Sequence, residues 1–422
     1  MRSLRLVMAG IAICVVGGYA AGGEVVQSKK PRNPSPRVSQ ADLQTLVSGN
    51  TKFAYDLYAA LRDRQANLFF SPQSISTALA MTYAGARRQT EREMAQALRF
   101  DLPQERLHPA FDKLDLTLAS RGRGAAGTKG RGFQLTVVNS LWGQTGHKFL
   151  PTFLDTLSEN YGAGMNALDF ERNPEGSRVT INQWVAAQTN GKIQNLIPAG
   201  MIHPMTRLVL TDAVYFNAAW AHPFRKEMDC NGEFNLLNGQ KVGVEMMVQT
   251  TRFNYGEAAN YQVLEMPYSG EEISMVFLVP RQGKFKSFEG SLNAKRAQAI
   301  LQDVSERTVH LTMPKFKYES SFALRKTLSS MGMPAAFREA DFSGMDGTLF
   351  LSIDDVVHKA LVRVDEEGTE AAAATAVAMA GGARGGQRPT ELTIDRPFIF
   401  LIRDRETGAV VFMGRVVDPR SA

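Results

Sequence analysis

Cysteine is scarce in this 422-residue sequence, which contains only Cys14 and Cys230. Cys14 lies within an apolar stretch, Leu6–Val16, that follows two arginines and precedes several small residues. This order is typical of a secretory signal peptide, and the stretch is too short for a comfortable membrane span. We therefore expect residues 1–21 to be a signal peptide. After its removal Cys230 alone remains, and no intramolecular disulfide can form.

The signal peptide predicts a secreted protein, extracellular or periplasmic, with no membrane contact after cleavage. Two alternatives stay open. The stretch could remain as an uncleaved anchor, or lipid could be attached to Cys14, although Ile13 is bulky where lipoprotein signals have a small residue. Residues 22–40 carry three prolines among polar residues, which predicts a disordered lead-in. Residues 41–420 show no break in composition and predict a single domain with a sizeable core.

An excess of positive charge is missing from most of the chain, although the formal net charge is +6. Residues 1–37 contain six lysines and arginines against Glu24 alone. This leaves 42 basic and 41 acidic residues of the 48 and 42 in the whole sequence. A nearly neutral body gives no support to nucleic-acid binding.

Signatures of enzymes are absent as well. The sequence has no G-x-S-x-G, H-E-x-x-H, P-loop or C-x-x-C motif, and its six histidines show no spacing typical of metal ligands. A G-x-G-x-x-G match, Gly122–Gly127, follows a helix-like segment instead of a strand, which argues against a dinucleotide site. We expect neither enzymatic activity nor a bound cofactor or metal.

What the sequence does contain is a run of small residues, Val364–Met379, followed by a glycine-rich segment at 381–388. Helix propensity alone favours an alanine-rich helix after Thr369. With a period of two, however, Glu370 lies on one face and the other face is uncharged. Such a segment can be a loop or can become a central strand, because small uncharged side chains leave nothing buried without a partner. The uncharged face consists of Thr369, Ala371, Ala373, Thr375, Val377 and Met379.

This run resembles the hinge and reactive-centre loop of the serpins, a family of serine-protease inhibitors. The resemblance extends from about Asp42 to Pro419, with phrases in the family's order such as N-L-F-F-S-P-Q-S-I-S, I-D-D-V-V-H-K-A and R-P-F-I-F-L-I-R-D. It implies a reactive-centre loop at about 366–392. The hinge would consist of Glu366, Gly368, Thr369, Glu370, Ala371, Ala372, Ala373 and Ala374.

The resemblance also assigns residues that control the opening of the main sheet. Ser71 and Ser74 match the shutter serines, and Trp220 matches the breach tryptophan. Lys315 matches the lysine that pairs with the hinge glutamate, Glu366. Local patterns alone allow plainer interpretations, since Ser71 precedes a proline as a helix N-cap does and a lone tryptophan is usually a core residue.

One shutter position departs from the family pattern. The family usually has an asparagine eight residues before the breach tryptophan, whereas this chain has Asp212. His358 matches the shutter histidine and is the expected neighbour of Asp212. We therefore expect an ion pair between these two side chains.

The fold implied by the resemblance is α+β, with a large mixed central sheet, two smaller sheets, surrounding helices and an exposed reactive-centre loop. The implied function is suicide-substrate trapping by a monomer. A serine protease cuts the loop, the loop inserts into the main sheet, and the protease is held in a covalent complex. The alternative is a non-inhibitory serpin that acts as a binding or chaperone-like protein, although such members usually have bulky or charged hinge residues.

Three bonds are candidates for cleavage. Family spacing from the hinge reaches Gly382-Ala383, where glycine offers little to a specificity pocket. Arg384-Gly385 would suit the acidic pocket of a trypsin-like protease. Met379-Ala380 would suit an elastase-like enzyme, but a cut there shortens the inserting arm. We favour Arg384.

A basic, glycine-rich segment at 121–132 is a further feature. Some serpins bind heparin through basic residues near this position, so a polyanion could make weak contact here. The plainer interpretation is a solvated loop. The basic residues are Arg121, Arg123, Lys129 and Arg131.

Overall fold

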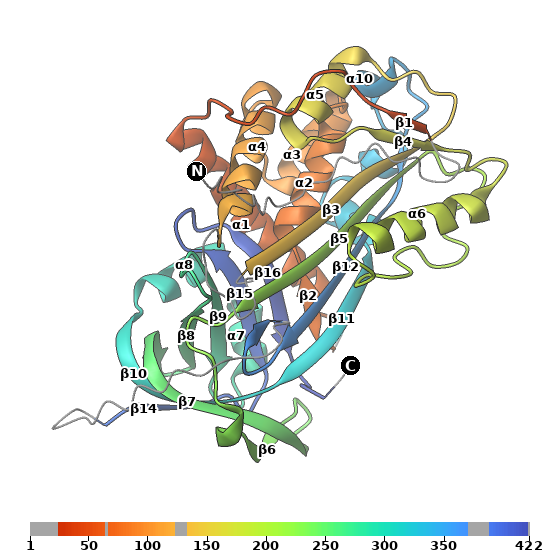
Figure 1. Cartoon of the computed structure of the whole chain (residues 1–422). Coiled ribbons are helices and arrows are strands. Elements are labelled where there is room, and N and C mark those ends of the chain that lie inside the picture. The colour runs from red at the N-terminus through yellow and green to blue at the C-terminus, as the bar shows by residue number, and fades with distance from the viewer. Residues whose placement is uncertain (1–23, 64–65, 123–132, 370–387, 421–422) are drawn as a thin grey trace, which may run out of the picture.

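The computed structural model describes residues 24–63, 66–122, 133–369 and 388–420, which form an α+β fold (Figure 1). The described strands of the main sheet run in the order β1-β4-β3-β5-β13-β12-β11. These strands are β1 (Glu24–Val26), β3 (Phe133–Gln144), β4 (Met165–Leu168), β5 (Leu208–Ala219), β11 (Phe316–Ala323), β12 (Ile353–Val364) and β13 (Gly368–Thr369).

The second sheet joins strands that were expected in two smaller sheets. Its described path is β14-β10-β7-β8-β9-β15-β16-β2, with β6 beside β7. One path results because β7 is 18 residues long and pairs with β10 and with β8 over successive parts of its length. The strands are β2 (Leu68–Phe70), β6 (Cys230–Asn235), β7 (Lys241–Ala258), β8 (Tyr261–Pro267), β9 (Ile273–Pro280), β10 (Ser305–Pro314), β14 (Thr390–Thr393), β15 (Phe398–Asp404) and β16 (Val410–Val416).

The helices surround the sheets, and none in the described part of the chain is long and apolar enough to cross a membrane. They are α1 (Gln40–Leu61), α2 (Pro72–Tyr83), α3 (Arg88–Leu98), α4 (Gln104–Ser120), α5 (Pro151–Tyr161), α6 (Pro174–Gln188), α7 (Phe285–Ser291), α8 (Ala294–Gln302), α9 (Arg325–Ser330) and α10 (Ser343–Asp346), with 3-10 turns at Lys226–Met228 and Pro334–Phe337.

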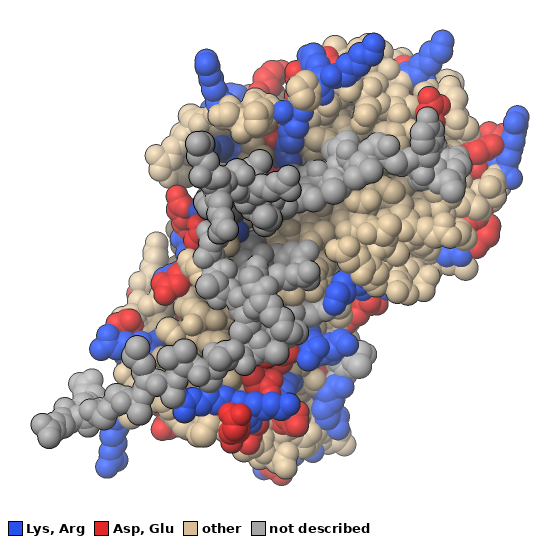
Figure 2. Space-filling view, viewed as in Figure 1, with Lys and Arg blue, Asp and Glu red and all other residues tan. Residues whose placement is uncertain are grey.

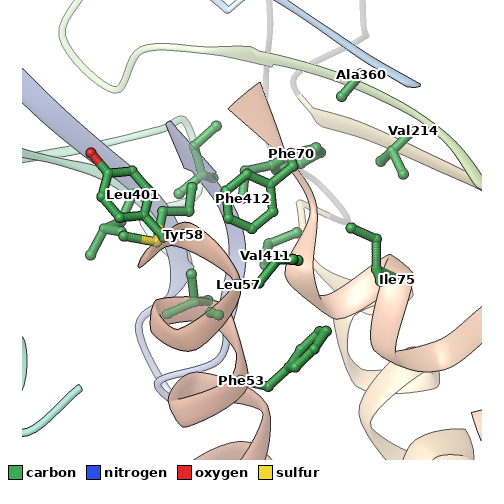
Figure 3. Packing of buried hydrophobic residues seen from close by; sticks show 14 of the residues in the cluster. Phe53, Leu57, Tyr58, Phe70, Ile75, Val214, Ala360, Leu401, Val411 and Phe412 are labelled. Carbon is green, nitrogen blue, oxygen red and sulfur yellow. The ribbon is translucent and has the colours of Figure 1, made fainter. Parts of the chain in front are cut away.

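The core lies between the two sheets, where α1 and α2 contribute apolar side chains. Phe53 and Leu57 of α1 pack near Phe412 of β16, and Ile75 of α2 lies near Val214 of β5 (Figure 3). All five side chains are buried. α2 therefore packs against β5 of the main sheet, and both α1 and α2 pack against β16 of the second sheet.

β5 and β12 are neighbours for most of their length but separate at one end. They pair in parallel from Leu208 beside Ile353 to Tyr215 beside Leu361. Beyond Tyr215 the short strand β13 lies between them. The sheet is thus closed at one end and open at the other, where β13 occupies the gap.

The lead-in differs from the expected disorder. β1 pairs with β4 at the edge of the main sheet, and Arg32 binds Asp112 and Asp115 of α4 at 2.7 and 2.6 Å. Lys30 lies 2.9 Å from Asp155 of α5. Disorder over residues 22–40 is therefore wrong from Glu24 onward, because edge pairing and ion pairs fix this segment against the body.

Candidate functional site

The hinge enters the main sheet where β5 and β12 separate. Gly368 pairs with Ala219 and Thr369 with Ala218, and Thr369 also pairs with Val364 at the end of β12. Gly368 has a φ of +152°, and a Cβ there would lie 2.1 Å from the carbonyl oxygen of Ala218. Only glycine fits this position without strain. The two hinge residues already form a short strand within the sheet.

Two stacked aromatic rings lie against this hinge strand. Trp220 donates from Nε1 to the carbonyl oxygen of Asp365 at 3.0 Å and from its backbone nitrogen to Glu367 at 2.8 Å. Its ring stacks on Tyr268 with centroids 4.5 Å apart. The hydroxyl of Tyr268 lies 2.7 Å from Oγ1 of Thr369. Trp220 is therefore both a core residue and a direct contact of the hinge.

Lys315 stands at the centre of a cluster of carboxylates at the open end of the sheet. Its Nζ lies 2.8 Å from Glu366, 2.8 Å from Asp229 and 3.3 Å from Glu245. The expected contact with Glu366 is present, and two further carboxylates share the same ammonium group. Glu366 is the first residue of the hinge. This cluster therefore fixes the point at which the loop leaves the sheet.

Two opposing effects set the pKa values in this cluster: burial disfavours the charged forms, and pairing with an opposite charge favours them. Burial favours neutral Lys315, but hydrogen bonds with Asp229 and Glu366 outweigh it and raise the pKa of the lysine. Burial also opposes the charge on Glu366, yet its contact with Lys315 brings the pKa of the glutamate below its usual value. For Asp229 burial prevails and raises the pKa. The lysine is thus held in its charged form by Asp229 and Glu366 together.

A pH dependence follows from the lowered pKa of Glu366. Its pairing should stabilise the fold fully above the pKa of an unfolded glutamate, about 4.3, and lose this effect as pH falls through the folded-state value. Glu366→Gln should therefore lower the free energy of unfolding by about 1 kcal/mol near pH 6 and by less near pH 3. Denaturant titrations of both proteins at the two pH values measure this difference. A difference of equal size at both would contradict the assignment.

The shutter residues meet beneath the closed part of the sheet. Ser71 is the N-cap of α2 and also donates from Oγ to the carbonyl oxygen of Val411 at 2.8 Å. Ser74 Oγ lies 2.5 Å from Asp212 Oδ1 and 3.1 Å from Asn139 Oδ1. Ser71 is therefore a cap that also links α2 to β16, and Ser74 links α2 to β3 and β5.

His358 and Asp212 lie side by side, but as a neutral histidine beside a carboxylate. Nδ1 of His358 is 3.1 Å from Oδ2 of Asp212, and the two groups are not aligned as a hydrogen bond. The backbone N–H of Ser71 donates to Nε2 of His358 at 3.2 Å. A nitrogen that accepts this bond carries no proton, so the single ring proton is on Nδ1. The expected contact is present, whereas the expected charge on His358 conflicts with the Ser71 bond.

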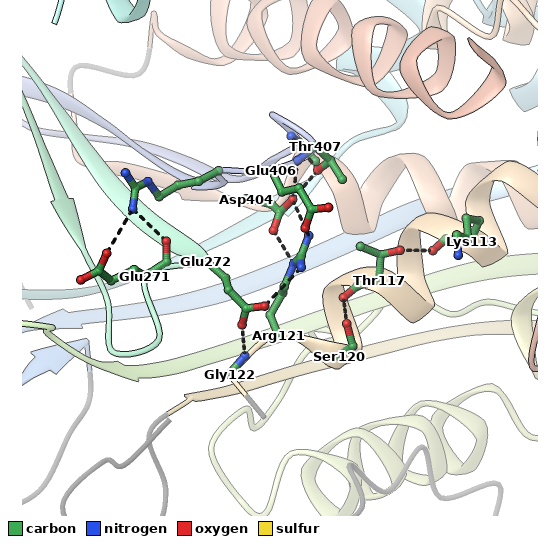
Figure 4. A network of polar contacts seen from close by, with 12 residues as sticks. Lys113, Thr117, Ser120, Arg121, Gly122, Glu271, Glu272, Asp404, Glu406 and Thr407 are labelled. Atoms are coloured by element: carbon green, nitrogen blue, oxygen red, sulfur yellow. Dashed lines mark hydrogen bonds and ion pairs between the residues drawn. The ribbon is translucent and has the colours of Figure 1, made fainter. Parts of the chain in front are cut away.

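Arg121 is not available for a polyanion. It is 7% exposed, and its guanidinium binds Asp404 at 2.7 Å, Glu406 at 2.6 Å and Glu272 at 3.2 Å (Figure 4). These partners come from the β15–β16 turn and from the loop before β9, so Arg121 joins the end of α4 to the second sheet. The polyanion assignment of Arg121 is therefore wrong, because three carboxylates already surround its charge.

On the face shown in Figure 2, basic and acidic side chains are interspersed, and neither sign forms a single continuous area.

Several predicted residues lie outside the described ranges, so their positions stay predictions. The residues outside the described ranges are Arg123, Lys129 and Arg131 of the basic segment, Glu370, Ala371, Ala372, Ala373 and Ala374 of the hinge, and Met379, Gly382, Ala383, Arg384 and Gly385 around the candidate scissile bonds.

Four residues of the site were not predicted from the sequence. Asp229 and Glu245 join the Lys315 cluster, Asn139 contacts Ser74, and Tyr268 contacts the hinge. Asp229 and Tyr268 lie just outside strands in segments without a distinctive pattern, and Asn139 is one polar residue in a strand. Only the tertiary pairing of distant segments reveals them.

The described main sheet thus has an opening between β5 and β12, and the first residues of the loop lie in it. A family model described as Serpin (serine protease inhibitor) matches residues 48–419. An uncharacterized serpin-like protein of Thermococcus kodakarensis is 40% identical over 419 residues, covering 94% of this chain and 96% of the relative. Human leukocyte elastase inhibitor is 38% identical over 394 residues, covering 89% of this chain and all of the relative.

Solved structures agree with this match. The native state of tengpin, a thermophilic serpin, superposes with a TM-score of 0.82 and 27% sequence identity, covering 94% of this chain and all of tengpin. The chain belongs to the serpin family, whose members generally inhibit proteases and are not enzymes themselves.

Proposed function

We propose that this protein is an inhibitory serpin that traps a serine protease by inserting its cleaved loop between β5 and β12. The observation that carries the proposal is β13, which places Gly368 and Thr369 in the sheet at the open end. The first pair of a new central strand is therefore already formed. Insertion needs only that the strands separate further along the same line.

The register of β13 supports insertion of the whole small-residue run. Thr369 pairs antiparallel with Ala218, so continued pairing in the same register would bring residue 379 beside Leu208, the first residue of β5. On the uncharged face of the run, each side chain would share the face of an even-numbered β5 residue. Five of these six β5 residues belong to the hydrophobic core: Leu208, Leu210, Val214, Phe216 and Ala218.

The same register supports Arg384 as the residue that becomes acylated. A cut after Met379 would leave no chain beyond the end of β5. A cut after Arg384 would leave five further residues, or about 16 Å of extended chain, to carry the protease past the sheet. Arginine also suits a protease with an acidic specificity pocket. The similarity to a leukocyte elastase inhibitor keeps an elastase-like target, cutting at Met379, as the second candidate.

The chemical step is an interrupted proteolysis. The protease serine attacks the carbonyl carbon of Arg384, the peptide C–N bond breaks, and the amine of Gly385 leaves with a proton. An ester remains between the serine and Arg384. Insertion then pulls on this ester and displaces it from the oxyanion hole, where loss of one donor alone slows hydrolysis by about 100-fold.

A non-inhibitory, ligand-binding or chaperone-like role is the competing function. Serpins with such a role usually have bulky or charged hinge residues. In this chain Gly368 and Thr369 are small, and Thr369 is fully buried in the sheet. Secretion, extracellular or periplasmic, is part of the proposal and is supported by the signal-like residues 1–21. Those residues lie outside the described ranges.

The test is incubation of the purified protein with trypsin and, separately, with an elastase. Denaturing gels should show a band at the summed mass with trypsin, and mass spectrometry of the released C-terminal peptide should find Gly385 as its first residue. A peptide that begins with Ala380 would move the scissile bond to Met379. Complete cleavage by both proteases without a stable band would contradict the inhibitory function.

A further inference from the structure

Tyr268 links the second sheet to the hinge of the reactive-centre loop. It follows β8 directly, and its backbone nitrogen donates to Ile273 at 2.9 Å. The ring is fully buried, stacks on Trp220 at an interplanar angle of 8°, and meets Phe216 edge-on with centroids 5.2 Å apart. Its position is therefore fixed by two aromatic neighbours.

The hydroxyl of Tyr268 ends at the buried hinge hydroxyl. Oγ1 of Thr369 lies 2.7 Å away, and either group can donate to the other. Both residues have no exposed surface, so water cannot replace the bond if one hydroxyl is lost. Burial also raises the pKa of Tyr268, which keeps its hydroxyl protonated. The pair is thus a stable neutral hydrogen bond at the open end of the sheet.

The backbone around this pair adds to the constraint. Ser269 donates to the carbonyl oxygen of Ala219 at 2.7 Å, and Trp220 forms an isolated bridge with Tyr268. Ala219 is also the partner of Gly368 in the main sheet. Tyr268 therefore lies at the junction where the two sheets meet β13, with its hydroxyl directed to the one side chain of β13 that has a polar group.

We propose that Tyr268 is a positioning residue for loop insertion, which holds Thr369 in the sheet so that the new strand starts in the correct register. This inference rests on the proposed inhibitory function. Forming the first residue pair of a new strand fixes several backbone torsions and gains few hydrogen bonds. The first pair is therefore the least favourable step of strand insertion. A hinge that is already seated avoids that step in the interval between acylation and hydrolysis.

The variant Tyr268→Phe tests this role because it keeps the ring stack and removes only the hydroxyl. It leaves the hydroxyl of Thr369 buried without that partner. The hinge strand β13 should therefore separate from β5 and β12 more often. We expect the number of inhibitor molecules consumed per trapped trypsin to rise by about fivefold to tenfold, the factor for one lost hydrogen bond. The rate at which trypsin first cuts the loop should stay the same or rise.

Two further variants separate positioning from general destabilisation. Tyr318→Phe is the matched control, since Tyr318 is also buried and its hydroxyl donates to the carbonyl oxygens of Leu68 and Arg415 at 2.9 and 3.0 Å, away from the hinge. Tyr318→Phe should lower the free energy of unfolding without changing the number of inhibitor molecules consumed per trapped trypsin. Thr369→Val should reproduce the effect of Tyr268→Phe, and the double variant should be no worse than either single one.

Hydrogen exchange gives a readout that needs no protease. The amides of residues 364–369 should exchange about tenfold faster in Tyr268→Phe than in the wild type and remain unchanged in Tyr318→Phe. If the wild type traps no protease, the proposed function fails, and faster exchange would still establish Tyr268 as the hinge anchor. The inference would be overturned if Tyr268→Phe changed neither the exchange rates of these amides nor the number of inhibitor molecules consumed per trapped trypsin.

Discussion

Thr369→Arg is expected to convert the protein from an inhibitor that retains its protease into a substrate that is cut and released. Thr369 is fully buried between β5 and β12, and its hydroxyl has one partner, Tyr268. A guanidinium at this position would enter the sheet as a charge without a counter-ion, at a cost of several kcal/mol. Insertion would then be slower than hydrolysis of the acyl-enzyme, and the trapped fraction should fall about 100-fold.

The same substitution at an exposed threonine provides the control. Thr393 lies on β14 with its side chain exposed, so Thr393→Arg adds an equal charge without burying it. Quantification of the stable band on denaturing gels at equal trypsin concentration compares the variants. The insertion mechanism predicts full trapping by Thr393→Arg and almost none by Thr369→Arg. Equal trapping by both would show that trapping does not require an uncharged side chain at position 369 of the sheet, which contradicts the insertion mechanism.

Lys315→Met is expected to destabilise the native state by about 3 kcal/mol, because it leaves partly buried carboxylates without their cation. The side chains of Glu366 and Asp229 are only 14% and 15% exposed and both lie 2.8 Å from Lys315. Their repulsion would act at the point where the loop leaves the sheet. We expect Lys315→Met to release the hinge from this contact and to accelerate loop insertion on mild heating.

Lys317 offers a matched control two residues away on β11. Its side chain is exposed, so Lys317→Met removes the same charge without leaving a buried partner. Urea titration should give a midpoint near that of the wild type for Lys317→Met and a clearly lower one for Lys315→Met. The loss in Lys315→Met should shrink as pH falls, when the carboxylates become protonated. Similar midpoints for the two variants would contradict the claim that Lys315 stabilises the fold by pairing with buried carboxylates.

Local sequence patterns predicted the parts of the fold in which neighbouring residues determine the structure. Ser71 followed by Pro72 predicted the start of α2, and the structure has Ser71 as the N-cap of that helix. An apolar run before Pro280 is typical of a buried strand, and the structure has β9 there. Asn173 and Pro174 have the same capping pattern as Ser71 and Pro72, and α6 begins at Pro174 with Asn173 as its N-cap.

The site could be predicted only where the family phrases are contiguous. Lys315 and Glu366 are joined by the resemblance, and the structure places them in contact. Arg121 looked like a free cation because its nearest charged neighbours in the sequence are basic, whereas its partner Asp404 is 283 residues away. Arg32 likewise seemed part of a polar tail, although Asp112 lies 80 residues away on α4. Long-range pairing of this kind leaves no local pattern.

The most direct test of strand insertion is the thermal stability of the protein before and after one cut in the loop. Cleavage within residues 370–387 frees the arm, and insertion would add a strand bonded on both sides to β5 and β12. About ten new residue pairs, at roughly 1 kcal/mol each, should raise the melting temperature by about 20 °C in calorimetry. This rise is the result we predict. An unchanged or lower melting temperature in the cleaved protein, with the chain otherwise intact, would contradict insertion and with it the trapping mechanism.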